Sequence, residues 1–202
     1  SLDQIYRRSV LGTYYVYDIN SKSLSLVSEN KIQEPTFNND ASKIAYGYAN
    51  NLYVRDIKTG NTMQITDDGK KNGIINGITD WVYEEEFAFV RAFDWNKDGT
   101  KIAFIRFDET EVPEFSMDVY GKELYQTQQV FKYPKAGEAN ADVSLHIYNL
   151  GSEETTKVDV SGYNSYYIPR IEWTNDSDIL SAQLTNRHQN VLDLVFVDTK
   201  RN

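Results

Sequence analysis

Three consecutive glutamates, Glu84 to Glu86, are the residues of this sequence most suggestive of chemistry. Carboxylates held close together repel one another unless a cation joins them. A substrate ammonium, a Lys, an Arg or a metal ion would each serve as that cation, whereas the plainer interpretation is a solvated acidic helix face. The plainer interpretation is weakened by aromatic residues on both sides, which place an apolar wall beside the carboxylates: Trp81, Tyr83, Phe87 and Phe89.

The element that positions these glutamates is predicted to be a short helix. Asp80 precedes them and is a residue type that caps helix N-termini. Carboxylates near the start of a helix are favoured by its dipole. Since the segment 76–86 lies between two strand repeats, the helix would occupy a loop between sheets.

The chemistry of a complete hydrolase is missing from the sequence. No Gly-x-Ser-x-Gly nucleophile motif occurs. His146 lies in a predicted strand and His188 in a polar turn, so that we expect a structural and an exposed residue rather than a Ser–His–Asp arrangement. No metal-ligand spacing appears. We therefore expect no peptidase activity from this chain alone, no metal and no cofactor.

A repeated pattern predicts β-hairpins along the chain. Each unit has an aromatic residue, an Asp three places later, an aliphatic residue seven places later, and then a small residue. The units are Phe37…Asp40…Ile44-Ala45, Trp95…Asp98…Ile102-Ala103 and Trp173…Asp176…Leu180-Ser181. Their middle parts are typical of tight turns. We expect Phe37, Trp95 and Trp173 to be buried at equivalent positions.

A second pattern, of alternating apolar residues, predicts further strands between these hairpins. Segments 52–57 and 145–150 have this period of two. Units of four strands, about 40 to 50 residues apart, indicate an all-β chain of antiparallel β-propeller blades, with the Glu triplet on a short helix. Residues 1–202 hold about three to four blades and should not close into a ring. A β-sandwich is the alternative, but it has no reason to repeat the aromatic–Asp–aliphatic unit.

An insertion from Glu111 to Asn140 widens one spacing between blades. A loop of about 30 residues is unusual unless it is functional or disordered. Its spaced aromatic residues favour a protein–protein contact, and the alternative is an extended strand pair that packs on its own propeller. These aromatic residues are Phe115, Tyr120, Tyr125 and Phe131.

The composition excludes several classes of partner. The formal net charge of −9 and pI near 4.8 argue against nucleic acid, although a cationic ligand is compatible with them. No apolar run approaches the roughly 18 residues of a membrane helix. The chain has no Cys, hence no disulfides, and begins at Ser1 without a targeting signal, as expected of an excised or processed segment.

Three motifs resemble the dipeptidyl peptidase IV family: Asp80–Glu86, Thr110–Pro113 and Tyr133–Gly137. The resemblance extends from Tyr6 to near the C-terminus. It implies the N-terminal β-propeller of a serine-type exopeptidase that releases Xaa-Pro or Xaa-Ala dipeptides. It also implies that the catalytic α/β-hydrolase domain, which follows the propeller in this family, is absent from residues 1–202.

The resemblance assigns roles to individual residues. Glu85 and Glu86 would bind the α-ammonium of the peptide, and Arg7 would contact the carbonyl group of its first residue. The segment 115–133, with Phe115, Tyr120 and Tyr125, resembles an arm that joins two subunits in a homodimer.

The sequence also suggests a location for the protein and leaves alternative functions open. The abundance of Asn, Lys and Tyr suggests a bacterial source, and exported bacterial members of the family would lie in the periplasm or at the cell surface. The alternative function is a non-catalytic propeller that serves as a platform for protein interactions. A sugar-binding propeller is a third, which would require aromatic residues exposed on one face.

Overall fold

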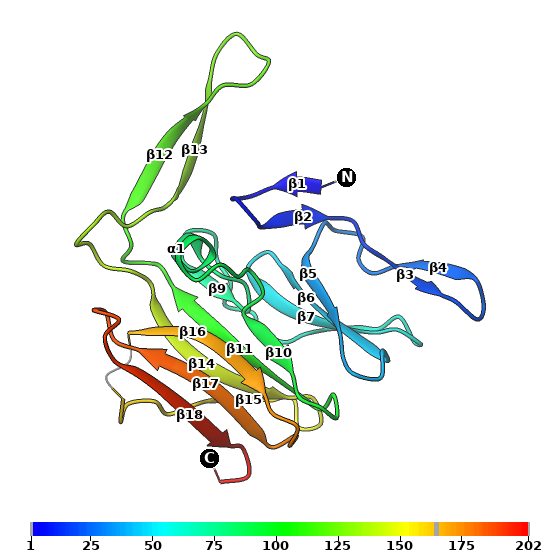
Figure 1. The fold of residues 1–202 in the computed structure, drawn as a ribbon. Coiled ribbons are helices and arrows are strands. Elements are labelled where there is room, and N and C mark those ends of the chain that lie inside the picture. The colour runs from blue at the N-terminus through cyan, green and yellow to red at the C-terminus, as the bar shows by residue number, and fades with distance from the viewer. Residues whose placement is uncertain (1, 164–165, 202) are drawn as a thin grey trace.

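The computed structural model describes residues 2–163 and 166–201, and its secondary structure is nearly all β-strand (Figure 1). Antiparallel sheets follow one another along the chain, each formed by strands close in sequence. A short helix, α1 (Trp81–Glu86), lies between two of these sheets in the sequence. The predicted all-β architecture with a helix at the Glu triplet is confirmed.

Two sheets contain the predicted four-stranded unit. The first has the order β5 (Gln33–Phe37), β6 (Lys43–Tyr48), β7 (Asn51–Asp56) and β8 (Thr62–Gln64). The second has the order β10 (Phe93–Trp95), β11 (Lys101–Asp108), β14 (Asp142–Asn149) and β15 (Glu154–Lys157). An additional strand, β9 (Ile74–Asn76), pairs with the far end of β11.

The other sheets have fewer strands. A three-stranded sheet contains β16 (Tyr167–Trp173), β17 (Ile179–Thr185) and β18 (Leu192–Asp198). Two-stranded sheets are formed by β1 (Leu2–Gln4) with β2 (Val10–Gly12), and by β3 (Tyr15–Asp18) with β4 (Ser23–Leu26). The insertion forms another pair, β12 (Glu114–Val119) with β13 (Thr127–Lys132).

Among the described residues, the hydrophobic core consists of three clusters, each between consecutive sheets. Val16 and Ile44 belong to the cluster between β3–β4 and β5–β8. Leu52 and Phe104 belong to the next, between the two four-stranded sheets. The third joins the β10–β15 sheet to β16–β18. A sheet that packs on both of its faces is typical of propeller blades, whereas the two sheets of a sandwich share one interface.

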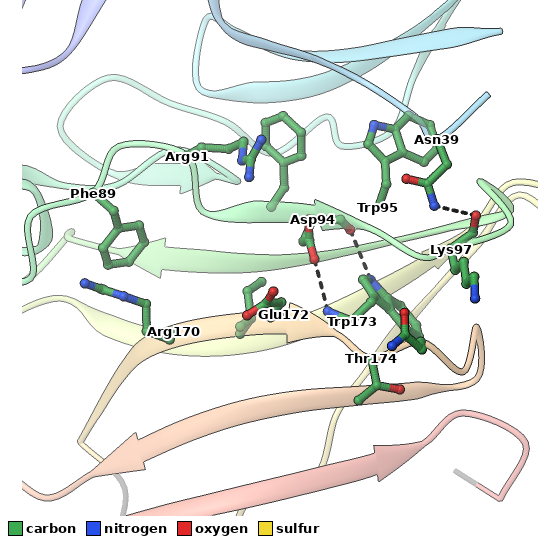
Figure 2. Close-up of a pocket in the computed structure, with 13 residues that line it drawn as sticks. Asn39, Phe89, Arg91, Asp94, Trp95, Lys97, Arg170, Glu172, Trp173 and Thr174 are labelled. Carbon is green, nitrogen blue, oxygen red and sulfur yellow. Dashed lines mark hydrogen bonds between the residues drawn. The ribbon is translucent and has the colours of Figure 1, made fainter. Parts of the chain in front are cut away.

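The repeated aromatic residues occupy equivalent places in their sheets. Phe37, Trp95 and Trp173 each lie opposite the aliphatic residue of their own unit in the strand register. The indole Nε1 of Trp95 donates to the carbonyl oxygen of Thr36 at 3.2 Å, in the preceding blade. Trp173 repeats this contact with the carbonyl oxygen of Asp94 at 3.1 Å (Figure 2). Both Trp side chains are buried, as predicted.

The predicted burial of Phe37 is wrong, because this side chain is 44% exposed. Its place in the repeat faces the sheet that precedes it, and that sheet has only the strands β3 and β4. A phenyl ring also has no N–H group to donate to the preceding blade, as the two indoles do. Position in the repeat therefore determines the register of the aromatic residue, while its burial depends on the neighbouring sheet.

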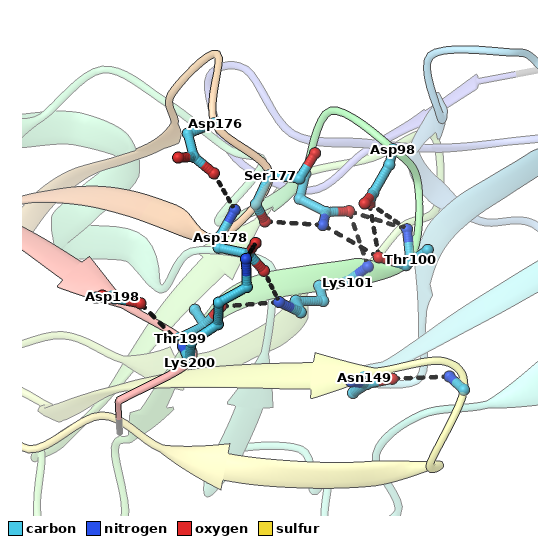
Figure 3. A network of polar contacts seen from close by, with 12 residues as sticks. Asp98, Thr100, Lys101, Asn149, Asp176, Ser177, Asp178, Asp198, Thr199 and Lys200 are labelled. Carbon is cyan, nitrogen blue, oxygen red and sulfur yellow. Dashed lines mark hydrogen bonds and ion pairs between the residues drawn. The ribbon is translucent and has the colours of Figure 1, made fainter.

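An ion-pair network joins the β10–β15 sheet to the β16–β18 sheet (Figure 3). Lys101 Nζ lies 2.6 Å from Asp178 Oδ1 and 2.8 Å from Thr199 Oγ1. Lys200 Nζ lies 2.5 Å from the other carboxylate oxygen of Asp178. Hydrogen bonds from Lys101 and then from Lys200 lower the pKa of Asp178 to about 2.

Replacing Asp178 should therefore reduce stability in a pH-dependent way. The pKa of Asp178 is lower in the folded than in the unfolded chain, so its contribution is complete above about pH 4 and is lost as the pH falls toward 2. We expect Asp178→Asn to lower the Tm at pH 7 and the difference to disappear near pH 2. Asp142→Asn, at an exposed carboxylate, is the control. A difference that stays constant down to pH 2 would contradict this assignment.

Candidate functional site

The helix α1 begins as the sequence predicts. Asp80 is its N-cap, and the Oδ1 atom of Asp80 accepts a hydrogen bond from the backbone N–H of Tyr83 at 2.9 Å. The helix ends at Glu86, and Phe87 is its C-cap, whose N–H donates to the carbonyl oxygen of Tyr83. Ala88 follows with a φ of +61°, a left-handed conformation that an α-helix does not continue.

Tyr83 fixes this short helix to the blades. Its side chain is 1% exposed, and its hydroxyl oxygen accepts a hydrogen bond at 2.9 Å from the N–H of Ile168, in β16. Its ring lies against Phe107 of β11 and Phe87, at centroid distances of 4.8 and 5.0 Å. Burial raises the pKa of Tyr83 well above its usual value. The hydroxyl therefore remains protonated, and α1 is attached to two sheets at once.

The three glutamates have three different environments. Glu84 is fully buried, and its Oε1 atom accepts hydrogen bonds from the N–H groups of Arg8 and Ser9 at 2.5 and 2.9 Å. The Glu85 side chain is 18% exposed and its Oε2 atom lies 3.0 Å from Arg7 Nε. Glu86, at the end of the helix, is exposed. Successive residues of a helix point about 100° apart, which separates the three carboxylates.

Arg7 reaches the helix from a distant part of the sequence. It lies in the turn between β1 and β2, and the β1–β2 hairpin lies above α1 in Figure 1. Its side chain is 72% exposed, and its pairing with Glu85 spans 78 positions. The structure thus brings Arg7 next to Glu85. Glu86 is the next residue of the same helix. These are the three residues to which the family resemblance assigns peptide binding.

A cleft of about 590 Å³ opens beside the Arg7–Glu85 pair. The ring centroids of Trp81 and Tyr133 lie 4.3 Å apart, and those of Tyr6 and Phe131 lie 5.8 Å apart. Both pairs line the cleft, together with Phe115. Glu85 therefore lies beside aromatic rings. Of the aromatic residues expected beside the Glu triplet, Trp81 lines this cleft, whereas Tyr83, Phe87 and Phe89 pack in the hydrophobic core.

Two further buried carboxyl groups lie close to the site. Burial raises the pKa of Asp80 to about 6. Glu109 is 7% exposed, and burial, with the charge of Asp80, raises its pKa to about 7. Burial followed by the charges of Glu109 and Asp80 also raises the pKa of Tyr6. Glu109 was not singled out from the sequence, because it stands in the acidic run 108–111 and nothing in that run marks one residue for burial.

The insertion projects from the body as the β12–β13 hairpin (Figure 1). At its tip, Tyr120 and Tyr125 are 79% and 78% exposed. At its root, Phe115 is 37% exposed. Its ring packs near those of Phe131 and Tyr133, at centroid distances of 6.1 and 5.4 Å. The root of this hairpin therefore contacts the candidate site, while its tip extends away from the blades.

The two histidines lie apart from the Arg7–Glu85 pair. His146, in β14, stacks on Phe104 and shares a 2.9 Å hydrogen bond with Ser144. Burial, then the charge of Arg106, lowers the pKa of His146 to about 4, which makes it a weak base. His188 is exposed in a turn. Within residues 2–163 and 166–201 no group of three potential ligands could hold a metal ion, and no helix is long and apolar enough to span a membrane.

Residues 1–202 match the family described as the dipeptidyl peptidase IV (DPP IV) N-terminal region. The chain belongs to this family. The probable dipeptidyl-aminopeptidase B of Chaetomium globosum is 32% identical over 212 residues, which cover 96% of this DPP IV N-terminal region and 23% of the relative. The prolyl endopeptidase FAP of Homo sapiens is 32% identical over 204 residues, covering 96% and 27%.

The crystal structure of dipeptidyl peptidase 4 from Porphyromonas gingivalis has the same fold, with a TM-score of 0.94 and 38% identity. The match covers 99% of this DPP IV N-terminal region and 29% of that chain. The family resemblance and the propeller fold predicted from the sequence are confirmed. The DPP IV N-terminal region described here spans about a quarter of the length of these relatives.

The raised pKa of Glu109 predicts a pH-dependent stabilisation by Glu109→Gln. The folded chain holds the proton of Glu109 more tightly than the unfolded chain, so ionisation destabilises the fold as the pH rises from about 4.5 to 7. A neutral amide removes this penalty. We expect the Tm of Glu109→Gln to exceed that of the unchanged protein at pH 8 and to approach it at pH 4. Glu111→Gln, an exposed neighbour, is the control; a pH-independent difference for Glu109→Gln would contradict the assignment.

Proposed function

We propose that this chain is the peptide-binding part of a serine-type dipeptidyl peptidase, in which Glu85 and Glu86 hold the α-ammonium of the substrate. The observation that carries the proposal is the meeting of Arg7 with Glu85, at 3.0 Å, directly before Glu86 and beside an aromatic cleft. Membership of the DPP IV N-terminal region family supports a peptidase as the whole protein.

The chemistry of a peptide N-terminus fits these carboxylates. An α-amino group has an ordinary pKa of about 7.7–8.0, so at neutral pH it is mostly an ammonium with three N–H donors. Glu85 and Glu86 supply acceptors and compensating charge through charge-assisted hydrogen bonds. Arg7 contributes only Nε to its contact with Glu85, and its guanidinium has further donors for the carbonyl oxygen of the first residue.

A free N-terminus is then selected over an internal peptide segment. An internal segment brings no ammonium and forms no charge-assisted hydrogen bonds with these carboxylates, so that Glu85 would keep only its pair with Arg7 and Glu86 only its contact with water. Holding the ammonium also sets how far the peptide extends toward the catalytic groups, so that cleavage follows the second residue. We propose that an α/β-hydrolase domain of the whole protein supplies the serine nucleophile and that residues 1–202 alone are inactive.

The relatives have names of two kinds: the fungal one is called a dipeptidyl-aminopeptidase and the human one an endopeptidase. Whether this protein requires a free N-terminal amine must therefore be measured. We expect Glu85→Gln or Glu86→Gln in the full-length protein to reduce kcat/KM for a Gly-Pro chromogenic substrate by about tenfold to a hundredfold. This corresponds to about 1.5–3 kcal/mol for a hydrogen bond to a charged group. Glu153→Gln, at an exposed turn residue, should leave kcat/KM unchanged.

The same variants should lose discrimination between free and blocked N-termini. The unchanged protein should reject an N-acetylated substrate strongly, and the variant with both glutamines should reject it far less. An undiminished preference for the free amine would mean that the two glutamates are only an acidic surface. A full-length protein that cleaves neither substrate would favour the alternative, a non-catalytic platform for protein interactions.

We further propose that the β12–β13 hairpin joins two copies of the full-length protein. The exposed Tyr120 and Tyr125 at its tip support this, because aromatic residues such as Tyr are enriched at protein–protein interfaces. Replacing Phe115, Tyr120 and Tyr125 with Ser should shift sedimentation toward the monomer, and an unchanged sedimentation coefficient would contradict the proposal.

The periplasmic or cell-surface location stays a prediction, which fractionation of the source cells would check.

A further inference from the structure

The carboxylate of Glu84 connects α1 to the hairpin that carries Arg7. Its Oε1 atom accepts hydrogen bonds from the two N–H groups that follow Arg7 in the chain, those of Arg8 and Ser9. Glu84 and Ser9 are 0% and 2% exposed, so the bond from Ser9 is buried, and the bond from Arg8 is partly buried. Hydrogen bonds to an ionised acceptor are about twice as strong as those between neutral groups.

Ser9 is the centre of the turn that presents Arg7. The carbonyl oxygen of Ser9 accepts a hydrogen bond from the N–H of Ile5 at 2.9 Å, and its hydroxyl oxygen accepts one from the N–H of Tyr6 at 3.2 Å. The turn is therefore closed around Ser9, which Glu84 holds against the helix. Farther along the hairpin, Gly12 and Ile32 exchange backbone hydrogen bonds that attach β2 to the body.

The contact between Arg7 and Glu85 is too exposed to hold this turn alone. The Arg7 side chain is 72% exposed. Exposed ion pairs contribute little to stability, because water screens them and two side chains must be ordered. Two backbone hydrogen bonds, one buried and one partly buried, restrict the turn more strongly than one largely exposed ion pair. The position of the Arg7 backbone therefore depends on Glu84 rather than on Glu85.

We propose that Glu84 is a positioning residue for peptide binding, which acts through Arg7 and does not touch the substrate. The inference rests on the proposed function of Arg7 and Glu85. The second oxygen of Glu84, Oε2, is buried without a hydrogen-bond partner, which is unfavourable for stability alone. The role of this buried carboxylate is then to accept the two adjacent N–H groups of Arg8 and Ser9 and so to hold the turn. The three glutamates then divide the work: Glu84 holds the turn, and Glu85 and Glu86 bind the ammonium.

A double-mutant cycle in the full-length protein tests this assignment. Glu84→Ala should lower kcat/KM for a Gly-Pro chromogenic substrate about tenfold, chiefly through KM, because the loss is in binding. Glu84→Gln keeps an oxygen acceptor and should recover most of the activity. In an Arg7→Ala background, Glu84→Ala should reduce kcat/KM by less than about twofold, since the residue it positions is gone. An equal loss in both backgrounds would overturn the proposal.

Hydrogen exchange supplies a readout that needs no substrate. Glu84→Ala should accelerate exchange of the Arg8 and Ser9 amides by about tenfold or more, because their acceptor is removed. The amides of Gly12 and Ile32, whose partners are retained, are the internal control and should exchange at an unchanged rate. Unchanged protection at Arg8 and Ser9 would overturn the positioning role. Failure of the ammonium proposal would show instead in Glu85→Gln and Glu86→Gln, with this exchange result unaltered.

Discussion

Three adjacent carboxylates on one helical turn repel one another, and the organisation of this site follows from how the fold relieves that repulsion. Glu84 points into a buried turn and receives two backbone N–H groups. Glu85 meets the guanidinium of Arg7, and Glu86 remains in solvent. A helix of six residues would not hold this arrangement alone, since isolated short helices are marginal in water. Tyr83, hydrogen-bonded to β16 and packed on β11, attaches it to two blades.

The blades bring distant segments together at this helix. The turn with Arg7, the helix and the root of the β12–β13 hairpin come from different parts of the sequence, and all contribute to one cleft. Indole hydrogen bonds between the first strands of consecutive sheets, β5, β10 and β16, and the Lys101–Asp178 pair keep the sheets in register with one another. A rigid stack of sheets is a suitable support for a binding site, because side chains on such a scaffold are held close to their productive geometry.

Features set by local sequence could be predicted, and features set by distant contacts could not. The period of the aromatic–Asp–aliphatic unit predicted the hairpins and their equivalent registers, and Asp80 marked the start of α1. The exposure of Phe37 depends on how many strands the preceding sheet has, which its own unit does not encode. The burial of Glu109 and the hydrogen bonds of Glu84 depend on residues many positions away, so that no local sequence pattern could predict them.

The central claim is that Glu85 and Glu86 bind a peptide through its α-ammonium. A crystal structure of the full-length protein with a bound dipeptide would test it most directly. The account predicts that the ammonium nitrogen lies at about 2.7–2.9 Å from a carboxylate oxygen of each glutamate, with the Arg7 guanidinium at the carbonyl group of the first residue. A dipeptide bound with its ammonium against other groups, and with neither Glu85 nor Glu86 within hydrogen-bond distance of it, would contradict the account.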